Sequence, residues 1–244
     1  MIEALFLVLG LCFGSFGSVL ICRVPQGELP CGRSKCPTCA KTLTIKELMP
    51  ILSYVFCLGR CRGCSTSIGW IYPFVEIISA AIFCFAYWYT GTPILAILLA
   101  LALWLLFVMA VIDAKTHTIA DMLNFPFVFI SLAYGFLSGG LDLIAPCIGA
   151  GFFALLWGMS RGKWIGSGDI FLGAGIGALV GAWQMMVASL MVTYVLGALI
   201  VSIMLVTKKV TRKSYVAFAP FLFLGTITTL LLERYIQQVL WLYF

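Results

Sequence analysis

Long apolar segments separated by short polar breaks are the dominant pattern of this chain. An α-helix needs about 20 residues to cross a hydrocarbon core roughly 30 Å thick, and cutting the sequence at its polar and Gly/Pro-rich breaks leaves segments of about that length. The pattern predicts an all-α polytopic membrane protein with about eight transmembrane helices, with seven or nine as alternatives. The expected spans are 3–22, 73–91, 93–112, 122–138, 143–160, 170–184, 186–206 and 216–238.

Composition supports this fold class. Hydrophobic residues make up 63% of the 244 positions and charged residues only 10%, and the mean hydropathy is +1.12. A soluble domain carries roughly one-quarter charged residues, so that class is excluded. The net charge of +6 comes from basic residues in short runs between apolar segments, which is how orientation signals are distributed. We therefore expect a lipid bilayer as partner and no nucleic acid.

The basic residues also predict the topology. Segment 23–72 is rich in lysine and arginine, and by the positive-inside rule it faces the cytoplasm, with both termini outside. We expect three parts: a retained first anchor at 1–22, a cytoplasmic loop domain at 23–72 and a multi-helix membrane domain at 73–244. Apart from Arg234, the remaining basic residues fall on the same face: Lys115, Arg161, Lys163, Lys208, Lys209, Arg212 and Lys213.

The loop domain carries two CxxC pairs, which are Cys36 with Cys39 and Cys61 with Cys64. Their spacing is near that of a four-thiolate zinc site, in which each pair supplies two sulfur ligands. Two disulfides are the alternative, but the cytoplasm is reducing and favours metal ligation. We expect a structural Zn²⁺ that supplies much of the folding energy of this small loop.

Asp113 and Asp169 lie at the ends of apolar segments, the second within Gly166-Ser167-Gly168-Asp169. An ionisable group at a membrane boundary is costly to desolvate, and two carboxyl groups that converge share a proton. The two aspartates open to the same face and are the candidate catalytic pair of an aspartyl enzyme. Gly166 and Gly168 would allow unusual backbone conformations and the close approach of a peptide. The alternative for Asp169 is a helix N-cap in a glycine-rich turn.

Other polar residues are weaker candidates. Asp121 begins the next span and is the rival partner for the pair, although it is better explained as a capping or supporting residue. His117 is the only histidine and is expected to face solvent, which disfavours a histidine-dependent triad. Glu76 is expected to pair with a loop arginine or to contribute to the cytoplasmic site, and a snorkelling, structurally satisfied carboxylate is the alternative.

The chain resembles the bacterial type IV prepilin peptidases, the GxGD aspartyl proteases, through several motifs in one order. The resemblance begins with GSFGSVLICRVP at 14–25 and continues through the cysteine pairs and YPFVE at 72–76. The later motifs of the family match three further segments, which are Ile112-Asp113 followed by Ile119, the segment from Gly166 to Asp169, and FAPFL at 218–222. Each match is modest alone, but their joint order is specific.

The resemblance implies a bifunctional enzyme of the bacterial inner membrane. Such enzymes cut the basic leader from type IV prepilins or type II secretion pseudopilins at the cytoplasmic face, with Asp113 and Asp169 as the protease pair. They then N-methylate the new amino terminus with S-adenosylmethionine. No glycine-rich nucleotide signature supports the methyl donor, so its binding residues are unknown from sequence. Peptidase activity alone, a carboxylate-dependent transporter and a zinc-dependent scaffold are the alternatives, and the oligomeric state is undetermined.

Three positions depart from the family pattern. Ser18, Ala120 and Phe171 stand where asparagine, proline and lysine are usual. The missing lysine removes a cation near Asp169, and Lys115 or Lys163 is the candidate replacement. These departures bear on rate and substrate preference more than on reaction type.

Overall fold

The computed structural model is helical, as expected, and describes residues 1–208, 210–211 and 214–243. No β-strand occurs within these ranges, and two isolated β-bridges lie in the loop before α3. Lys209, Arg212 and Lys213 of the last basic loop lie outside the described residues. The helices are α1 (Ile2–Arg23), α2 (Leu52–Phe56), α3 (Ile71–Thr90), α4 (Pro93–Thr116), α5 (Asp121–Leu137), α6 (Ile144–Ser160), α7 (Gly168–Val180), α8 (Trp183–Val206), α9 (Ala219–Leu231) and α10 (Glu233–Tyr243).

Four helices are long and apolar enough to cross a membrane: α1 with the 3₁₀ turn that follows it, α3, α4 and α8. The other apolar helices, α5, α6, α7 and α9, have 10–17 residues. The 13 residues of α7 measure only about 20 Å at 1.5 Å per residue. The chain is thus a membrane protein with several apolar helices, while the number of eight crossings stays a prediction.

The last expected span, 216–238, is wrong as a single helix. The structure ends α9 at Leu231 and starts α10 at Glu233. The sequence turns polar at this point, and Gln237 donates a hydrogen bond of 2.9 Å to the Glu233 carboxylate within α10. The polar side chains therefore begin a separate helix.

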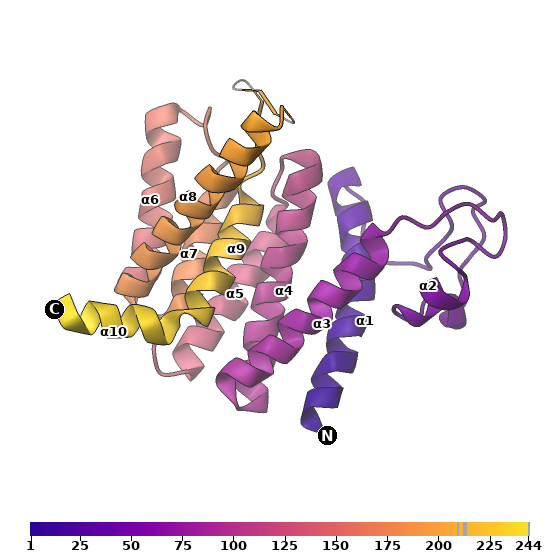
Figure 1. The fold of residues 1–244 in the computed structure, drawn as a ribbon, viewed down its shortest axis with the longest axis horizontal. Coiled ribbons are helices and arrows are strands. Elements are labelled where there is room, and N and C mark those ends of the chain that lie inside the picture. The colour runs from indigo at the N-terminus through magenta and orange to yellow at the C-terminus, as the bar shows by residue number, and fades with distance from the viewer. Residues whose placement is uncertain (209, 212–213, 244) are drawn as a thin grey trace. The chain divides into compact units, whose positions relative to one another are not determined.

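The chain forms two compact units, Met1–Ala100 and Leu101–Phe244. In the first unit, α1 and α3 lie side by side (Figure 1). Their backbones approach closely because Gly10 and Gly14 have no side chain: a Cβ on either would collide with the Cα of Ala80 or of Glu76. The functional division expected at residues 22 and 72 stays a prediction.

In the second unit, α7 packs against α5 and α6, and α8 packs against α6 and α9. A small-residue stretch of α7 makes this packing possible. A Cβ on Gly173 would collide with Phe153 and with the backbone of Gly149, and one on Gly175 would collide with the ring of Phe127. This internal packing accounts for the glycines and holds the start of α7 in place.

Candidate functional site

Asp113 lies in the last turns of α4 and is buried, with 6% of its surface exposed. Its Oδ2 accepts a hydrogen bond of 2.9 Å from the backbone N–H of Ala219, the first residue of α9. The first N–H groups of a helix have no partner within the helix, and the positive end of the helix dipole favours a negative charge there. The segment 218–222 therefore supplies a backbone donor to Asp113, a role that the sequence pattern did not reveal.

Asp169 is the second residue of α7 and is also buried, with 5% exposed. Its Oδ2 accepts a hydrogen bond of 3.1 Å from the backbone N–H of Gly166. The N-cap position belongs to Ser167, so the capping alternative for Asp169 is wrong. Its buried Oδ1 has no hydrogen-bond partner among the described residues. Buried polar atoms are normally paired, so this oxygen can accept a proton or bond to a ligand or water.

The two carboxyl groups interact electrostatically, although they come from helices more than fifty residues apart. Both belong to the unit Leu101–Phe244. Two carboxylates that are buried close together cannot both carry a charge cheaply, and in general such a pair holds one proton between its two members. Such a pair provides a general base and a general acid in one place.

Gly166 and Gly168, which precede Asp169, do not have the unusual backbone conformations that the sequence predicted for them. Neither adopts a positive φ. At Gly168 the reason for glycine is close packing, because a Cβ there would lie 3.1 Å from the Cβ of Ile119. Gly166 is exposed and contributes its N–H to Asp169.

Asn124 is a residue that the sequence analysis missed. It lies on α5, is 1% exposed, and its Nδ2 donates a hydrogen bond of 2.9 Å to the carbonyl oxygen of Gly168. Its Oδ1 has no partner in the described part of the chain. A lone amide within an apolar helix was the available signal. Tyr194 of α8 was also missed, and it interacts electrostatically with Asp169.

Three further polar candidates, Asp121, Lys115 and His117, are exposed. Asp121 lies at the first position of α5 and Lys115 in the last turn of α4, and no hydrogen bond or ion pair joins either to Asp113 or Asp169 within the described residues. His117 is exposed too, as expected, and its backbone N–H donates to the carbonyl of Asp113. Phe171 packs edge-on against Phe125, with ring centroids 5.4 Å apart.

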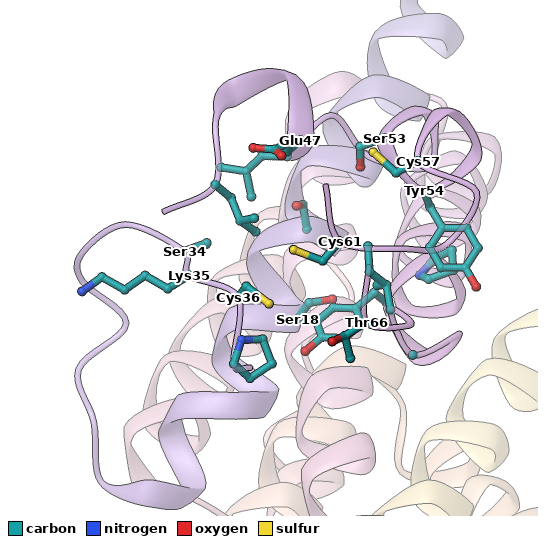
Figure 2. Close-up of a pocket in the computed structure, with 18 of the residues that line it drawn as sticks. Ser18, Ser34, Lys35, Cys36, Glu47, Ser53, Tyr54, Cys57, Cys61 and Thr66 are labelled. Carbon is teal, nitrogen blue, oxygen red and sulfur yellow. The ribbon is translucent and has the colours of Figure 1, made fainter. Parts of the chain in front are cut away.

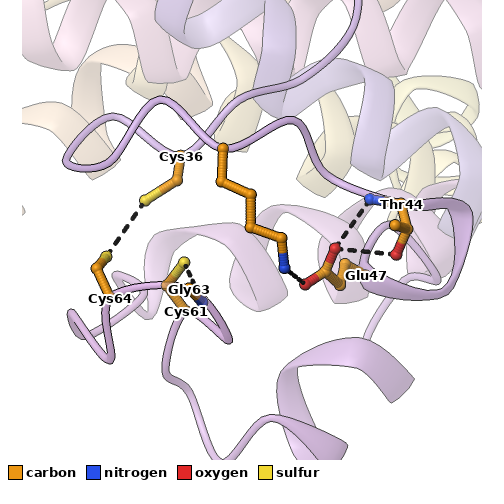
Figure 3. A network of polar contacts seen from close by, with 7 residues as sticks. Cys36, Thr44, Glu47, Cys61, Gly63 and Cys64 are labelled. Carbon is orange, nitrogen blue, oxygen red and sulfur yellow. Dashed lines mark hydrogen bonds and ion pairs between the residues drawn. The ribbon is translucent and has the colours of Figure 1, made fainter.

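The four paired cysteines converge in the loop between α1 and α3. The sulfur atoms of Cys36, Cys39, Cys61 and Cys64 all lie within 4.8 Å of one another. Figure 3 shows Cys36 facing Cys64, with their Sγ atoms 3.8 Å apart. Four sulfurs placed tetrahedrally 2.3 Å from a zinc ion are separated by about 3.8 Å. The cluster therefore has the donor set and spacing that could hold a metal ion.

The two halves of this cluster share one local geometry. The N–H of Cys36 bonds to the carbonyl of Lys41, and the N–H of Cys61 bonds to the carbonyl of Thr66, each at 2.9 Å. The residue after each pair, Ala40 or Ser65, has a positive φ of 55° or 58°. This repeated turn points both pairs of sulfurs at a common centre.

The turns also stabilise thiolates. The backbone N–H of Cys39 lowers the pKa of Cys36, and that of Gly63 lowers the pKa of Cys61. The Thr66 side chain lowers the pKa of Cys64. The backbone N–H of Lys41 also lowers the pKa of Cys39. Burial and the neighbouring cysteines have the larger combined effect and raise the pKa of Cys39 to about 11. Thiolates are the form that binds metal.

Comparisons with known proteins identify relatives over nearly the whole chain. Residues 8–90 match the bacterial peptidase A24 N-terminal domain, and residues 100–202 match the type IV leader peptidase family. A prepilin leader peptidase/N-methyltransferase of Bacillus subtilis is 32% identical over 93% of this chain and 92% of its own length. A protein of the same name from Burkholderia pseudomallei is 32% identical over 93% of this chain and 84% of its own length. Another from Klebsiella pneumoniae is 33% identical over 72% of this chain and 83% of its own length. No solved structure matches the chain.

Proposed function

Because the chain belongs to the type IV leader peptidase family, we propose that it is a membrane enzyme that processes prepilins or pseudopilins. It removes the leader peptide and then methylates the new amino terminus. The support is the name that its relatives share, prepilin leader peptidase/N-methyltransferase, together with coverage of both family regions.

The observation that carries the peptidase proposal is the burial of Asp113 and Asp169 in one compact unit, where the charge of Asp113 acts on Asp169. The charged member removes a proton from water while the protonated member donates a hydrogen bond to the carbonyl oxygen of the scissile peptide. The water oxygen forms a bond to the carbonyl carbon, the carbon–nitrogen bond breaks, and the amine leaves with a proton from the pair. The unpaired Oδ1 of Asp169 is the atom best placed for this exchange.

We assign the site to the cytoplasmic face of a bacterial inner membrane. Asp113 and Asp169 adjoin the basic loops, and the positive-inside rule keeps such loops in the cytoplasm. A basic leader is retained on the same side for the same reason. The hydrophobic segment that follows a leader would then remain in the lipid while the junction unwinds at the boundary.

Zn²⁺ is the metal that best fits the cysteine cluster. Four thiolates at tetrahedral spacing leave no open position for a water, so the ion is structural. Cys36, Cys39, Cys61 and Cys64 are its ligands in this proposal. The loop has few buried apolar side chains, and the ion would supply much of its folding free energy.

Methyl transfer follows cleavage in the proposed sequence. The nitrogen of the new amino terminus attacks the methyl carbon of S-adenosylmethionine, the carbon–sulfur bond breaks with its electron pair left on sulfur, and the nitrogen loses a proton.

Peptidase activity alone is the second candidate function. A transporter is not favoured, because such proteins place their carboxylates near mid-bilayer, whereas Asp113 and Asp169 lie at helix ends.

The test uses full-length protein, a precursor peptide and S-adenosylmethionine, with the mass of the product amino terminus as readout. Asp113→Asn and Asp169→Asn should each lower cleavage by about 10²–10⁴-fold, while methylation of a pre-cleaved peptide continues. Asp121→Asn is the matched control and should cleave normally, because Asp121 is exposed. Normal cleavage by either dyad variant would refute the assignment.

A further inference from the structure

The unit Met1–Ala100 contains a cavity of about 410 Å³ between the adjacent ends of α1 and α3 and the cysteine loop. Small-molecule sites in proteins have volumes of roughly 300–1,000 Å³ and combine apolar walls with a few polar groups. Figure 2 shows the lining, with Ser18 from α1, Tyr54 from α2, and Cys61 and Thr66 from the loop between α2 and α3. The cavity is therefore large enough for a nucleoside-bearing ligand.

Glu76 of α3 lines this cavity and is a buried carboxylate without a counter-ion. It is 8% exposed, and no lysine or arginine forms an ion pair with it among the residues described here. The backbone N–H of Ile51 donates a hydrogen bond of 2.7 Å to its Oε2, and the Ser15 side chain also bonds to it. A buried charge without a partner is costly, so a cationic ligand would be favoured beside Glu76.

The donor to Glu76 is held in a strained turn. Ile51 has φ 60° and ψ −50°, which is exceptional for a β-branched residue, and the N–H of Leu52 bonds to the carbonyl of Pro50 across it. Strain of this kind persists where the surroundings fix it, and it often marks a ligand site. Here the turn directs the Ile51 N–H at the carboxylate and fixes the position of Glu76.

Aromatic and basic side chains complete the lining. The ring of Tyr54 packs over Gly59, where a Cβ would lie 3.1 Å from the ring, so its position is fixed. Arg60 and Arg62 also line the cavity. The buried Oγ of Ser18 has no partner among the described residues. The lining thus offers an aromatic face, an anchored carboxylate, guanidinium groups and a spare hydroxyl.

We propose that this cavity binds S-adenosylmethionine, with Glu76 facing the sulfonium and the aromatic and basic side chains receiving the adenine and the carboxylate. The ligand combines a flat base, a carboxylate and a fixed positive charge on sulfur, which match these groups. This inference rests on the proposed methyl-transfer function and extends it to a specific site.

The first test compares the affinities of the full-length protein for S-adenosylmethionine and for S-adenosylhomocysteine, whose sulfur is neutral, by calorimetry. Wild type should bind the charged ligand about tenfold more tightly, which corresponds to about 1.4 kcal/mol. Glu76→Gln should abolish this preference. Glu28→Gln is the matched control, since Glu28 is exposed in the same loop and does not line the cavity. Unchanged cleavage and zinc content would establish that Glu76→Gln is folded.

A second measurement does not depend on any variant. Ultraviolet cross-linking of labelled S-adenosylmethionine to wild type, followed by peptide mapping, should label peptides between residues 34 and 76. The proposed site is wrong if the label is confined to residues 101–244, or if Glu76→Gln keeps the wild-type preference for S-adenosylmethionine. Methylation of the cleaved peptide by wild type would then show that the proposed function still holds. If wild type cleaves the precursor but neither binds S-adenosylmethionine nor methylates the cleaved product, both the proposed site and the proposed methyl transfer are wrong.

Discussion

The side-chain amide of Asn124 donates a hydrogen bond of 2.9 Å to the carbonyl oxygen of Gly168, the residue directly before Asp169. This bond joins the first turns of α5 to the start of α7. Asn124 and Asp169 are both buried, so neither can rely on water to satisfy its polar atoms. We infer that Asn124 positions the loop that presents Asp169, without contacting the substrate.

Replacing Asn124 by leucine should therefore lower cleavage by about tenfold, because one buried hydrogen bond contributes on the order of 1–2 kcal/mol and Gly168 would lose its partner. The change should appear in kcat more than in KM, and methylation of a pre-cleaved peptide should not change. Ser131→Ala on the same helix removes only a bond to the preceding turn, at Phe127, and serves as the control. Equal loss of both activities would indicate a general folding defect instead.

The glycine contacts between α6 and α7 provide a test of the packing. Gly149→Ala would bring a Cβ against the carbonyl of Gly173, and it should destabilise the protein by about 1–3 kcal/mol. Gly151→Ala on the same helix meets no atom within 4 Å and should be neutral within about 0.5 kcal/mol. Thermal unfolding in detergent measures both, and equal midpoints for the two variants would contradict the described contact.

The cysteine cluster predicts a metal stoichiometry of about one ion per chain, because four thiolates form one closed tetrahedral site. Cys36→Ser should reduce the zinc content strongly and make the loop sensitive to proteases. Cys57→Ser is the control, since Cys57 lies outside the cluster. Elemental analysis of purified protein measures the zinc, and an unaltered content in Cys36→Ser would exclude the site.

Glu47 predicts a pH dependence of the loop. A hydrogen bond from Lys41 at 2.8 Å, followed by bonds from Thr44, lowers the pKa of Glu47 from 4.5 to about 2 (Figure 3). A group with a lowered pKa in the folded state stabilises it above its unfolded pKa, and this contribution is lost as the pH falls. Glu47→Gln should therefore destabilise the loop at pH 7 by an amount that is constant above about pH 4.5 and shrinks towards pH 2.

The measurement for Glu47 is the difference in loop stability between wild type and Glu47→Gln across this range, by protection from proteolysis or hydrogen exchange. Both proteins keep the same cysteines, so loss of metal at low pH affects them alike and largely cancels in the difference. A difference that persists unchanged at pH 2.5 would contradict the role of the carboxylate.

Several parts of the architecture could be predicted because they depend on local composition. The helical class, the two cysteine pairs and the exposed His117 follow from apolar segment length, short ligand spacing and a polar turn. The boundary at Leu232 was missed, because an apolar average over 216–238 hides the polar start of α10.

The amino-acid sequence by itself determined that this is a helical membrane protein, because apolar segment length and the scarcity of charge are properties of neighbouring residues. It also identified Asp113 and Asp169 as unusual, since a carboxyl group at a membrane boundary is costly wherever it occurs. Only the tertiary structure decided that Ala219 and Gly166 donate to these carboxyl groups, that Asn124 holds Gly168, and that Glu76 lines a cavity while forming no ion pair among the described residues. Those facts depend on contacts between residues distant in the chain, and such contacts leave no periodic signal in the sequence.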